Sequence, residues 1–412
     1  MRTPRLAFLI VGKALVAAAC TASSSADTIE STTTIEAAPT TTNTSTTTVS
    51  STAAAQTGSL PEGPSALDNR YAESFPEPLI NPDDILSGGP PPDGIPPIDD
   101  PQFVSVSVAD EWLNDQEPVL VVDINGDIRA YPIQILMWHE IVNDTVGGVP
   151  VTVTYCPLCN SAITFERTVQ GVETTFGTSG SLYFANLVMY DRATESLWNQ
   201  LDGRAVVGVL TGETLTQLPS SMVAWGDFKA ARSEAQILDR ERTGATRRYG
   251  TNPYTGLDDP NGQPFLFQGD IDVRAKAMQR VVAIETDAEA VAWPLDLLVD
   301  GEAAVTEGEL NGDPLVIFWK NGQSSALDTS DIAAGRDIGT VGVFSPILDG
   351  RPLTFEAEEG IFVDQETGTT WNVLGDAVEG PLAGSALEPI TFVRTFWFSW
   401  AAFRPDTELI EQ

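Results

Sequence analysis

The stretch DRATESLWN at 191–199 returns in the second half of the chain as DQETGTTWN at 364–372. The shared pattern is D-x-x-T-x-x-x-W-N, in which Asp and Thr favour turns and Trp brings a large apolar surface to a core. A second match lies upstream, where VTVTY at 151–155 aligns without gaps with LVIFW at 315–319. We therefore predict two copies of one structural unit, and we expect what both copies keep to serve the fold.

Further residues repeat at a fixed distance of 172 positions. Gly212, Leu215, Trp225, Phe228 and Arg232 recur as Gly384, Leu387, Trp397, Trp400 and Arg404. Between such landmarks the chain reads as short β-prone runs separated by turn signals, with Asn-Gly or Asp-Gly pairs at 125–126, 202–203, 311–312 and 349–350. Apolar spacing predicts helices over 132–142 and 225–238. The predicted fold class is mainly β (β-rich α+β), with two tandem, internally duplicated units packed together and a few short helices.

The N-terminal region has a different composition. Arg2 and Arg5 precede an apolar run that ends in AAAC at 17–20, which predicts a lipoprotein-type signal peptide over 1–20 with Cys20 as the lipidated residue. Ser and Thr dominate 21–58, which predicts a disordered tether. We expect an exported protein, anchored by this lipid to the outer face of the cell membrane.

The remaining boundaries follow composition and the repeat. Residues 59–104 are rich in Pro and Asp and are predicted to be extended. The first repeat unit is placed at 105–245, an irregular linker at 246–274 and the second unit at 275–412. The chain carries 22 Lys and Arg against 58 Asp and Glu, a net charge of −36. Because it has no basic run that could neutralise phosphates, we predict that it binds no nucleic acid.

The chain has three cysteines and one histidine, and three of these four residues lie between 139 and 159. Cys156 and Cys159 form a C-x-x-C motif, and His139 precedes it. In the second copy Lys320 and Gln323 stand opposite the two cysteines. Because only one copy carries these residues, we expect them to serve function rather than fold.

Three runs around these residues have a recognisable pattern, namely MWHEIVND at 137–144, TYCPLCNSA at 154–162 and LVMYDR at 187–192. Together they resemble the bacterial and archaeal family called domain of unknown function 3179, over roughly 93–412. The resemblance implies no established reaction.

Metal binding is the first chemistry that these residues suggest. Two thiolates and one imidazole form a Cys₂His set that suits Zn²⁺ or Cu(I). Met137, Met189, Asp144, Glu140 or water are candidates for a fourth ligand. A methionine there would favour copper, whereas a carboxylate or water would favour zinc.

Two alternatives remain open at this stage. The C-x-x-C can cycle between dithiol and disulfide as a thiol–disulfide oxidoreductase, with Cys156 as the attacking thiol. It can also be a structural disulfide in a non-catalytic surface protein. Ser179, Tyr183 and Asn186, in or near the FGTSG loop at 176–180, are candidates for lining a pocket.

Overall fold

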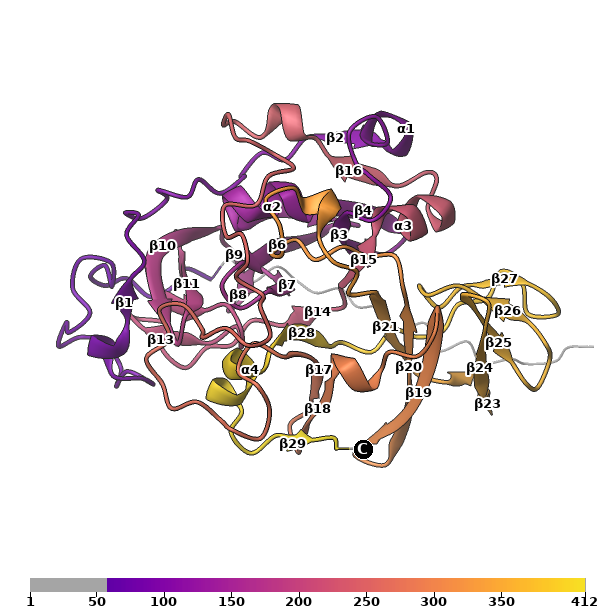
Figure 1. Cartoon of the computed structure of the whole chain (residues 1–412). Helices are drawn as coiled ribbons and strands as arrows, with labels where there is room; N and C mark the ends of the chain where they lie inside the picture. The colour runs from indigo at the N-terminus through magenta and orange to yellow at the C-terminus, as the bar shows by residue number, and fades with distance from the viewer. Residues whose placement is uncertain (1–57, 412) are drawn as a thin grey trace, which may run out of the picture. The chain divides into compact units, whose positions relative to one another are not determined.

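The computed structural model describes residues 58–411, which form short strands in several small sheets together with a few short helices (Figure 1). This confirms the predicted β-rich fold class. The predicted signal peptide with Cys20, and the tether up to residue 57, lie outside the described residues. Within 58–411, no helix has the length and apolar character that crossing a membrane requires.

Three sheets build the first half. The first sheet has the strand order β15 (Ser221–Ala224), β3 (Pro118–Ile124), β4 (Asp127–Pro132), β16 (Gln236–Leu238) and β2 (Phe103–Ser105). The second has the order β14 (Gln217–Leu218), β7 (Ser161–Glu166), β6 (Val149–Cys156) and β5 (Ile141–Val146). The third has the order β1 (Leu86–Ser87), β10 (Phe176–Tyr183), β11 (Asn186–Asp191), β12 (Leu197–Asn199) and β13 (Ala205–Val207). A small hairpin joins β8 (Thr168–Val169) to β9 (Val172–Glu173). The helical elements are η1 (Pro82–Asp84), α1 (Val106–Ala109), α2 (Ile133–His139), α3 (Trp225–Ala231) and η2 (Arg240–Arg242).

The second half has sheets of matching order. The first has the strand order β28 (Val393–Phe396), β17 (Arg280–Glu285), β18 (Ala290–Pro294) and β29 (Glu408–Leu409). The second has the order β21 (Thr340–Phe344), β20 (Asp313–Lys320) and β19 (Ala303–Leu310). The third has the order β24 (Phe355–Glu358), β25 (Ile361–Asp364), β26 (Thr370–Trp371) and β27 (Ala377–Glu379). A hairpin of β22 (Ile347–Leu348) and β23 (Arg351–Pro352), with η3 (Leu295–Leu297), η4 (Ile332–Ala334) and α4 (Trp397–Phe403), completes this half. Even the parallel pair β4–β16 of the first half has a parallel counterpart, β18–β29.

The repeated nine-residue stretch forms the same turn in both halves. Asp191 accepts hydrogen bonds from the Thr194 backbone N–H at 2.7 Å and the Trp198 indole N–H at 3.0 Å. Asp364 accepts the equivalent bonds from Thr367 at 2.7 Å and Trp371 at 2.9 Å. Because both carboxylates are fully buried, these donors replace the water that each would otherwise need.

The predicted hairpin at 125–126 is confirmed between β3 and β4, where Asn125 and Gly126 both have positive φ, at 54° and 81°. The predicted helix over 132–142 is confirmed in a shorter form, since α2 ends at His139 and Glu140 has a φ of 58°. The predicted helix over 225–238 is wrong beyond Ala231. Its last residues form β16 instead, because Ile237 and Leu238 are buried between β2 and β4.

The two halves share one large hydrophobic core. It includes Tyr155 and Cys159 from the first half together with Phe396 and Trp400 from the second. Strand β28 contacts β7, so the first turn of α4 lies beside the C-x-x-C loop. The cysteines are therefore enclosed by both copies of the repeat.

Candidate functional site

The C-x-x-C motif occupies the turn between β6 and β7. Cys156 is the last residue of β6 and pairs with Ser161, the first residue of β7. Asn160 closes the turn with a φ of 52°, and its backbone N–H donates to the Pro157 carbonyl at 3.2 Å. Both cysteines are unbridged, and their exposed fractions are only 2% for Cys156 and 0% for Cys159.

One backbone carbonyl faces both sulfur atoms. The oxygen of Ala185 lies 3.8 Å from Cys156 Sγ and 3.4 Å from Cys159 Sγ. Ala185 and Phe184 form the turn between β10 and β11, and their φ angles of 61° and 49° are in the left-handed region. The two residues form the two-residue loop of the β10–β11 hairpin, in which a type I′ turn needs positive φ at both positions, and this backbone is costly for residues other than glycine. The strained turn therefore holds an acceptor over the dithiol.

The two thiols have opposite electrostatic environments. Burial would raise the pKa of Cys159, but the adjacent Cys156 thiol, the Ser399 hydroxyl and the Asn186 amide hold that pKa below its ordinary value. The Asn186 side-chain N–H contributes at 3.5 Å from Cys159 Sγ. Burial raises the pKa of Cys156 well above its ordinary value, and the hydrogen bond to Cys159 adds to this shift. Cys159 is thus the favoured thiolate, and Cys156 is the proton-bearing partner.

A polar network holds Asn186 in place. Its side-chain N–H also donates to Gln200 Oε1 at 2.9 Å, and its oxygen accepts the Leu201 backbone N–H at 3.0 Å. Gln200 in turn accepts from Ser161 Oγ and donates to Thr154 Oγ1, both at 2.9 Å. The donor to Cys159 is therefore positioned by buried groups from β6, β7 and the turn that follows β12.

A buried carboxyl group accompanies the dithiol. Burial raises the pKa of Glu140 to about 8, and the proximity of Cys156 adds to this shift. The Glu140 side chain is 7% exposed and forms no hydrogen bond with the described residues. Its backbone carbonyl accepts the Tyr155 N–H at 2.8 Å, which fixes it next to the end of β6. An acid with this pKa can exchange protons near neutral pH.

The second half closes the site from the other side. The Cys159 carbonyl accepts the Phe396 backbone N–H at 3.1 Å and the Thr395 hydroxyl at 2.8 Å. Ser399, in the first turn of α4, is one of the residues that lower the pKa of Cys159. Sequence reasoning missed these three residues.

His139 is engaged elsewhere. Its Nδ1 lies 2.7 Å from the Pro96 carbonyl, and its Nε2 lies 2.7 Å from the Tyr249 hydroxyl. Burial lowers its pKa, so the ring is neutral at pH 7. Across residues 58–411, no three His, Cys, Asp or Glu side chains are grouped so that they could hold a metal ion. The structure therefore brings Cys156 and Cys159 together but does not add His139 to them.

The other candidate ligands have separate roles. Asp144 pairs with Arg129 at 2.7 Å and accepts the Tyr131 hydroxyl at 2.6 Å. Met137 and Met189 are buried in the shared core, and only Glu140 is electrostatically coupled to a cysteine.

Of the candidate pocket residues, only Asn186 reaches a cysteine. The Ser179 hydroxyl donates to the Val188 carbonyl within its own hairpin. Tyr183 packs on Phe184, with ring centroids 4.2 Å apart. Gln200 was missed, although one signal marked it: it follows the repeated W-N pair where the second copy has Val373.

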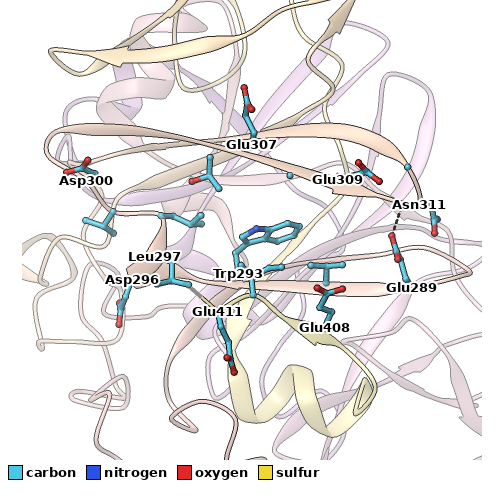
Figure 2. A pocket seen from close by; sticks show the side chains of 17 residues that line it. Glu289, Trp293, Asp296, Leu297, Asp300, Glu307, Glu309, Asn311, Glu408 and Glu411 are labelled. Carbon is cyan, nitrogen blue, oxygen red and sulfur yellow. Dashed lines mark hydrogen bonds between the residues drawn. The ribbon is translucent and has the colours of Figure 1, made fainter.

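A cavity of about 920 Å³ in the second half is lined by seven acidic residues, Glu289, Asp296, Asp300, Glu307, Glu309, Glu408 and Glu411. Figure 2 shows that their carboxylates point in different directions around Trp293. They do not converge on one point, and none of the predicted ligands lines this cavity. The cavity is strongly acidic, and neither Cys156 nor Cys159 is among the residues that line it.

The chain belongs to the family described as "Protein of unknown function (DUF3179)", whose model matches residues 92–407. This confirms the resemblance drawn from the three sequence runs. No curated protein and no solved structure matches the chain.

Proposed function

We propose that this protein is an exported, lipid-anchored thiol–disulfide oxidoreductase that uses Cys156 and Cys159. The observation that carries the proposal is the geometry of the dithiol, in which two buried, unbridged sulfurs face the Ala185 carbonyl and the Asn186 N–H lies 3.5 Å from Cys159 Sγ. The opposite directions of the two thiol pKa shifts and the raised pKa of Glu140 agree with it. A dithiol that only stabilised the fold would need neither a set of donors to one sulfur nor a proton-exchanging acid next to the other. Export and anchoring are proposed from the signal at 1–20 and Cys20.

The proposed roles reverse the order expected from the sequence, because Cys159 rather than Cys156 is the favoured thiolate. Cys159 attacks a substrate disulfide, forms a mixed disulfide and releases the first substrate thiolate, which takes a proton from solvent. In the fraction of molecules whose Glu140 carboxyl is ionised, Cys156 then transfers its proton to Glu140 and attacks the Cys159 sulfur. This step forms the Cys156–Cys159 disulfide and releases the second substrate thiolate. Two electrons pass from the dithiol to the substrate disulfide.

The exposed fractions of the cysteines limit the substrate. With 2% and 0% of their surface exposed, the sulfur atoms cannot meet a disulfide on the surface of a folded protein. We therefore propose a small-molecule disulfide as substrate, admitted by local opening of the structure around the cysteines. Burial and the proximity of Glu140 and Cys156 raise the pKa of Tyr254, so this part of the linker lies near the dithiol.

The test uses glutathione buffers of known potential, followed by acid quenching and alkylation of the remaining thiols. We expect one reversible two-electron transition between about −120 and −270 mV, the range of exchange catalysts. Cys156→Ser should accumulate a glutathione adduct on Cys159, whereas Cys159→Ser should accumulate none. A midpoint below about −300 mV would instead identify a structural disulfide.

A second candidate is binding of a thiophilic ion such as Cu(I) or Zn²⁺ between the two sulfurs, without His139. It is supported by the convergence of both sulfurs on the Ala185 carbonyl in apolar surroundings, because soft thiolates select such ions. Metal analysis of protein purified without chelators separates the two candidates. Stoichiometric copper or zinc that is lost in both Cys→Ser variants would favour the metal site over the redox centre.

A further inference from the structure

We propose that residues 259–273 of the linker form a strap that opens to expose Cys159, and that the Phe267 ring is the contact that holds this strap closed. The inference rests on the proposed redox function, since only a dithiol that reacts with an incoming disulfide needs a route from solvent. Both sulfurs are buried while the strap is in place. A segment that opens in this way must lie beside the site, be held weakly along its length and be fixed at its ends.

The Phe267 ring lies between two elements that flank Cys159. Its centroid is 5.8 Å from that of Phe184 and 5.2 Å from that of Phe398. Phe184 belongs to the β10–β11 turn, whose Ala185 carbonyl lies 3.4 Å from Cys159 Sγ, and Phe398 belongs to the first turn of α4. Phe267 also packs against the hydrophobic core that contains both cysteines. The strap therefore touches both the hairpin turn and the helix beside the proposed attacking thiolate.

Apart from this ring, little holds the middle of the strap to the rest of the protein. Among the described residues, positions 263–271 take part in no hydrogen bond. The large apolar neighbours of Phe267 are turned to solvent, with exposed fractions of 57% for Phe265 and 37% for both Leu266 and Ile271. A cavity of about 650 Å³, lined by residues 260–263 and by residues between 271 and 279, lies beside both ends of the strap. Few buried contacts and free backbone groups are the features of a segment that opens locally.

The two ends of the strap are firmly fixed. Before it, the buried Asp258 carboxylate accepts hydrogen bonds from Arg280 Nη2 at 2.7 Å and Arg336 Nη1 at 2.9 Å. At its far end, the Arg274 guanidinium donates to the backbone carbonyls of residues 405 and 407, both at 2.7 Å. The strap can therefore swing away from the site while the chain on either side stays in place, as a lid loop does.

The part of the linker before the strap is bound more tightly, which directs the opening toward Cys159. The backbone N–H groups of residues 252 and 256 donate to carbonyls of the second half at 2.9 and 2.8 Å. Tyr254, which lies near Cys156, stands between these two anchored positions. The side of the dithiol at Cys156 thus stays covered, and an incoming disulfide meets Cys159 first. This is the order that the proposed reaction requires.

The test measures how fast iodoacetamide alkylates Cys159 in the folded, fully reduced full-length protein at pH 7, by peptide mass spectrometry. Because a buried thiol reacts only when it becomes exposed, the rate reports the open fraction. Phe267→Ala removes both aromatic pairs. Each such pair is worth a factor of about two to ten, so the rate should rise about four- to hundredfold.

Phe265→Ala is the matched control, because it shortens an exposed aromatic side chain of the same strap. It should leave the rate unchanged, and urea unfolding shows that both variants are folded. Opening of so short a segment exposes little surface, so 1 M urea should raise the rate by less than about tenfold, whereas access through global unfolding would exceed this.

The proposal is overturned if Phe267→Ala alkylates at the unaltered rate, if Phe265→Ala accelerates the reaction as much as Phe267→Ala, or if 1 M urea exceeds the tenfold limit. Alkylation by iodoacetamide needs access to the thiol but no particular reduction potential. A glutathione titration that identified a structural disulfide would therefore reject the proposed function while leaving these rates as expected, so the two failures are distinguishable.

Discussion

Glu140→Gln tests whether the protein holds a protonated carboxyl beside its dithiol. The pKa of Glu140 is raised from 4.5 to about 8, chiefly by burial. Between these two pH values the folded protein binds a proton that the unfolded chain releases, so stability falls as pH rises. At about 1.36 kcal/mol per pH unit, this one group lowers the free energy of unfolding by roughly 3 kcal/mol at pH 7, and by roughly 5 kcal/mol at pH 8 and above.

Glutamine has the shape of the protonated acid but does not ionise. It should therefore remove the pH-dependent loss and leave stability near pH 4.5 almost unchanged. The strained φ of 58° at position 140 applies equally to Glu and Gln, so backbone strain cancels in the comparison. We expect Glu140→Gln to be more stable than the unaltered protein at pH 7, with a difference that grows up to pH 8.

The assay is urea unfolding in reducing buffer at pH 5, 6, 7 and 8, followed by tryptophan fluorescence. Glu379→Gln, an exposed position on β27, controls for the loss of one surface charge. The reasoning is refuted if the stability difference between Glu140→Gln and the unaltered protein is the same at pH 5 and pH 8.

Three further outcomes follow from named contacts. Asn186→Asp replaces the N–H donor to Cys159 with a carboxylate, so the pKa of Cys159 should rise and alkylation by iodoacetamide at pH 7 should slow by about tenfold for each pH unit of that rise. Asp364→Asn weakens a buried acceptor of several hydrogen bonds and should lower the free energy of unfolding by about 2–3 kcal/mol in urea titrations, while an unchanged midpoint would contradict its role in the turn. Arg232→Lys breaks a two-bond pair with Asp376, at 2.6 and 2.7 Å, and should cost only about 1 kcal/mol by the same assay, because both side chains are about one-fifth exposed.

Local signals in the sequence predicted much of the fold. The Asn125–Gly126 hairpin was predictable because both residues tolerate positive φ, and the repeated turn because Asp, Thr and Trp each have a local role in it. The end of α3 was not predictable from apolar spacing. Leu238 fits the helical stripe that begins at Trp225, but the burial of Ile237 and Leu238 is decided by β2 and β4, which lie far away in sequence.

The candidate site also combines features set by the local sequence with features set by residues far away in the chain. The turn containing Cys156 and Cys159 is local, and the C-x-x-C spacing marked both residues in the sequence. The partners of His139 are 43 and 110 positions away, and those of the Cys159 carbonyl are more than 230 away, so no local pattern could assign them. Comparison of the two copies was the better guide, and it also marked Gln200, which the second copy replaces with Val373.

The two copies also explain why a site in one half needs the other half. Each copy's C-x-x-C position faces the helix that the other copy supplies. Opposite Cys156 in the repeat stands Lys320, which pairs with Asp227 on α3; the counterpart of Asp227 is Ser399 on α4, which helps to lower the pKa of Cys159. The hairpin of one copy thus meets the facing helix through an ion pair, and the hairpin of the other copy places a cysteine near a serine. Because α4 of the second copy lies against the hairpin that carries Cys156 and Cys159, the second copy contributes to the chemical environment of Cys159 as well as to the fold.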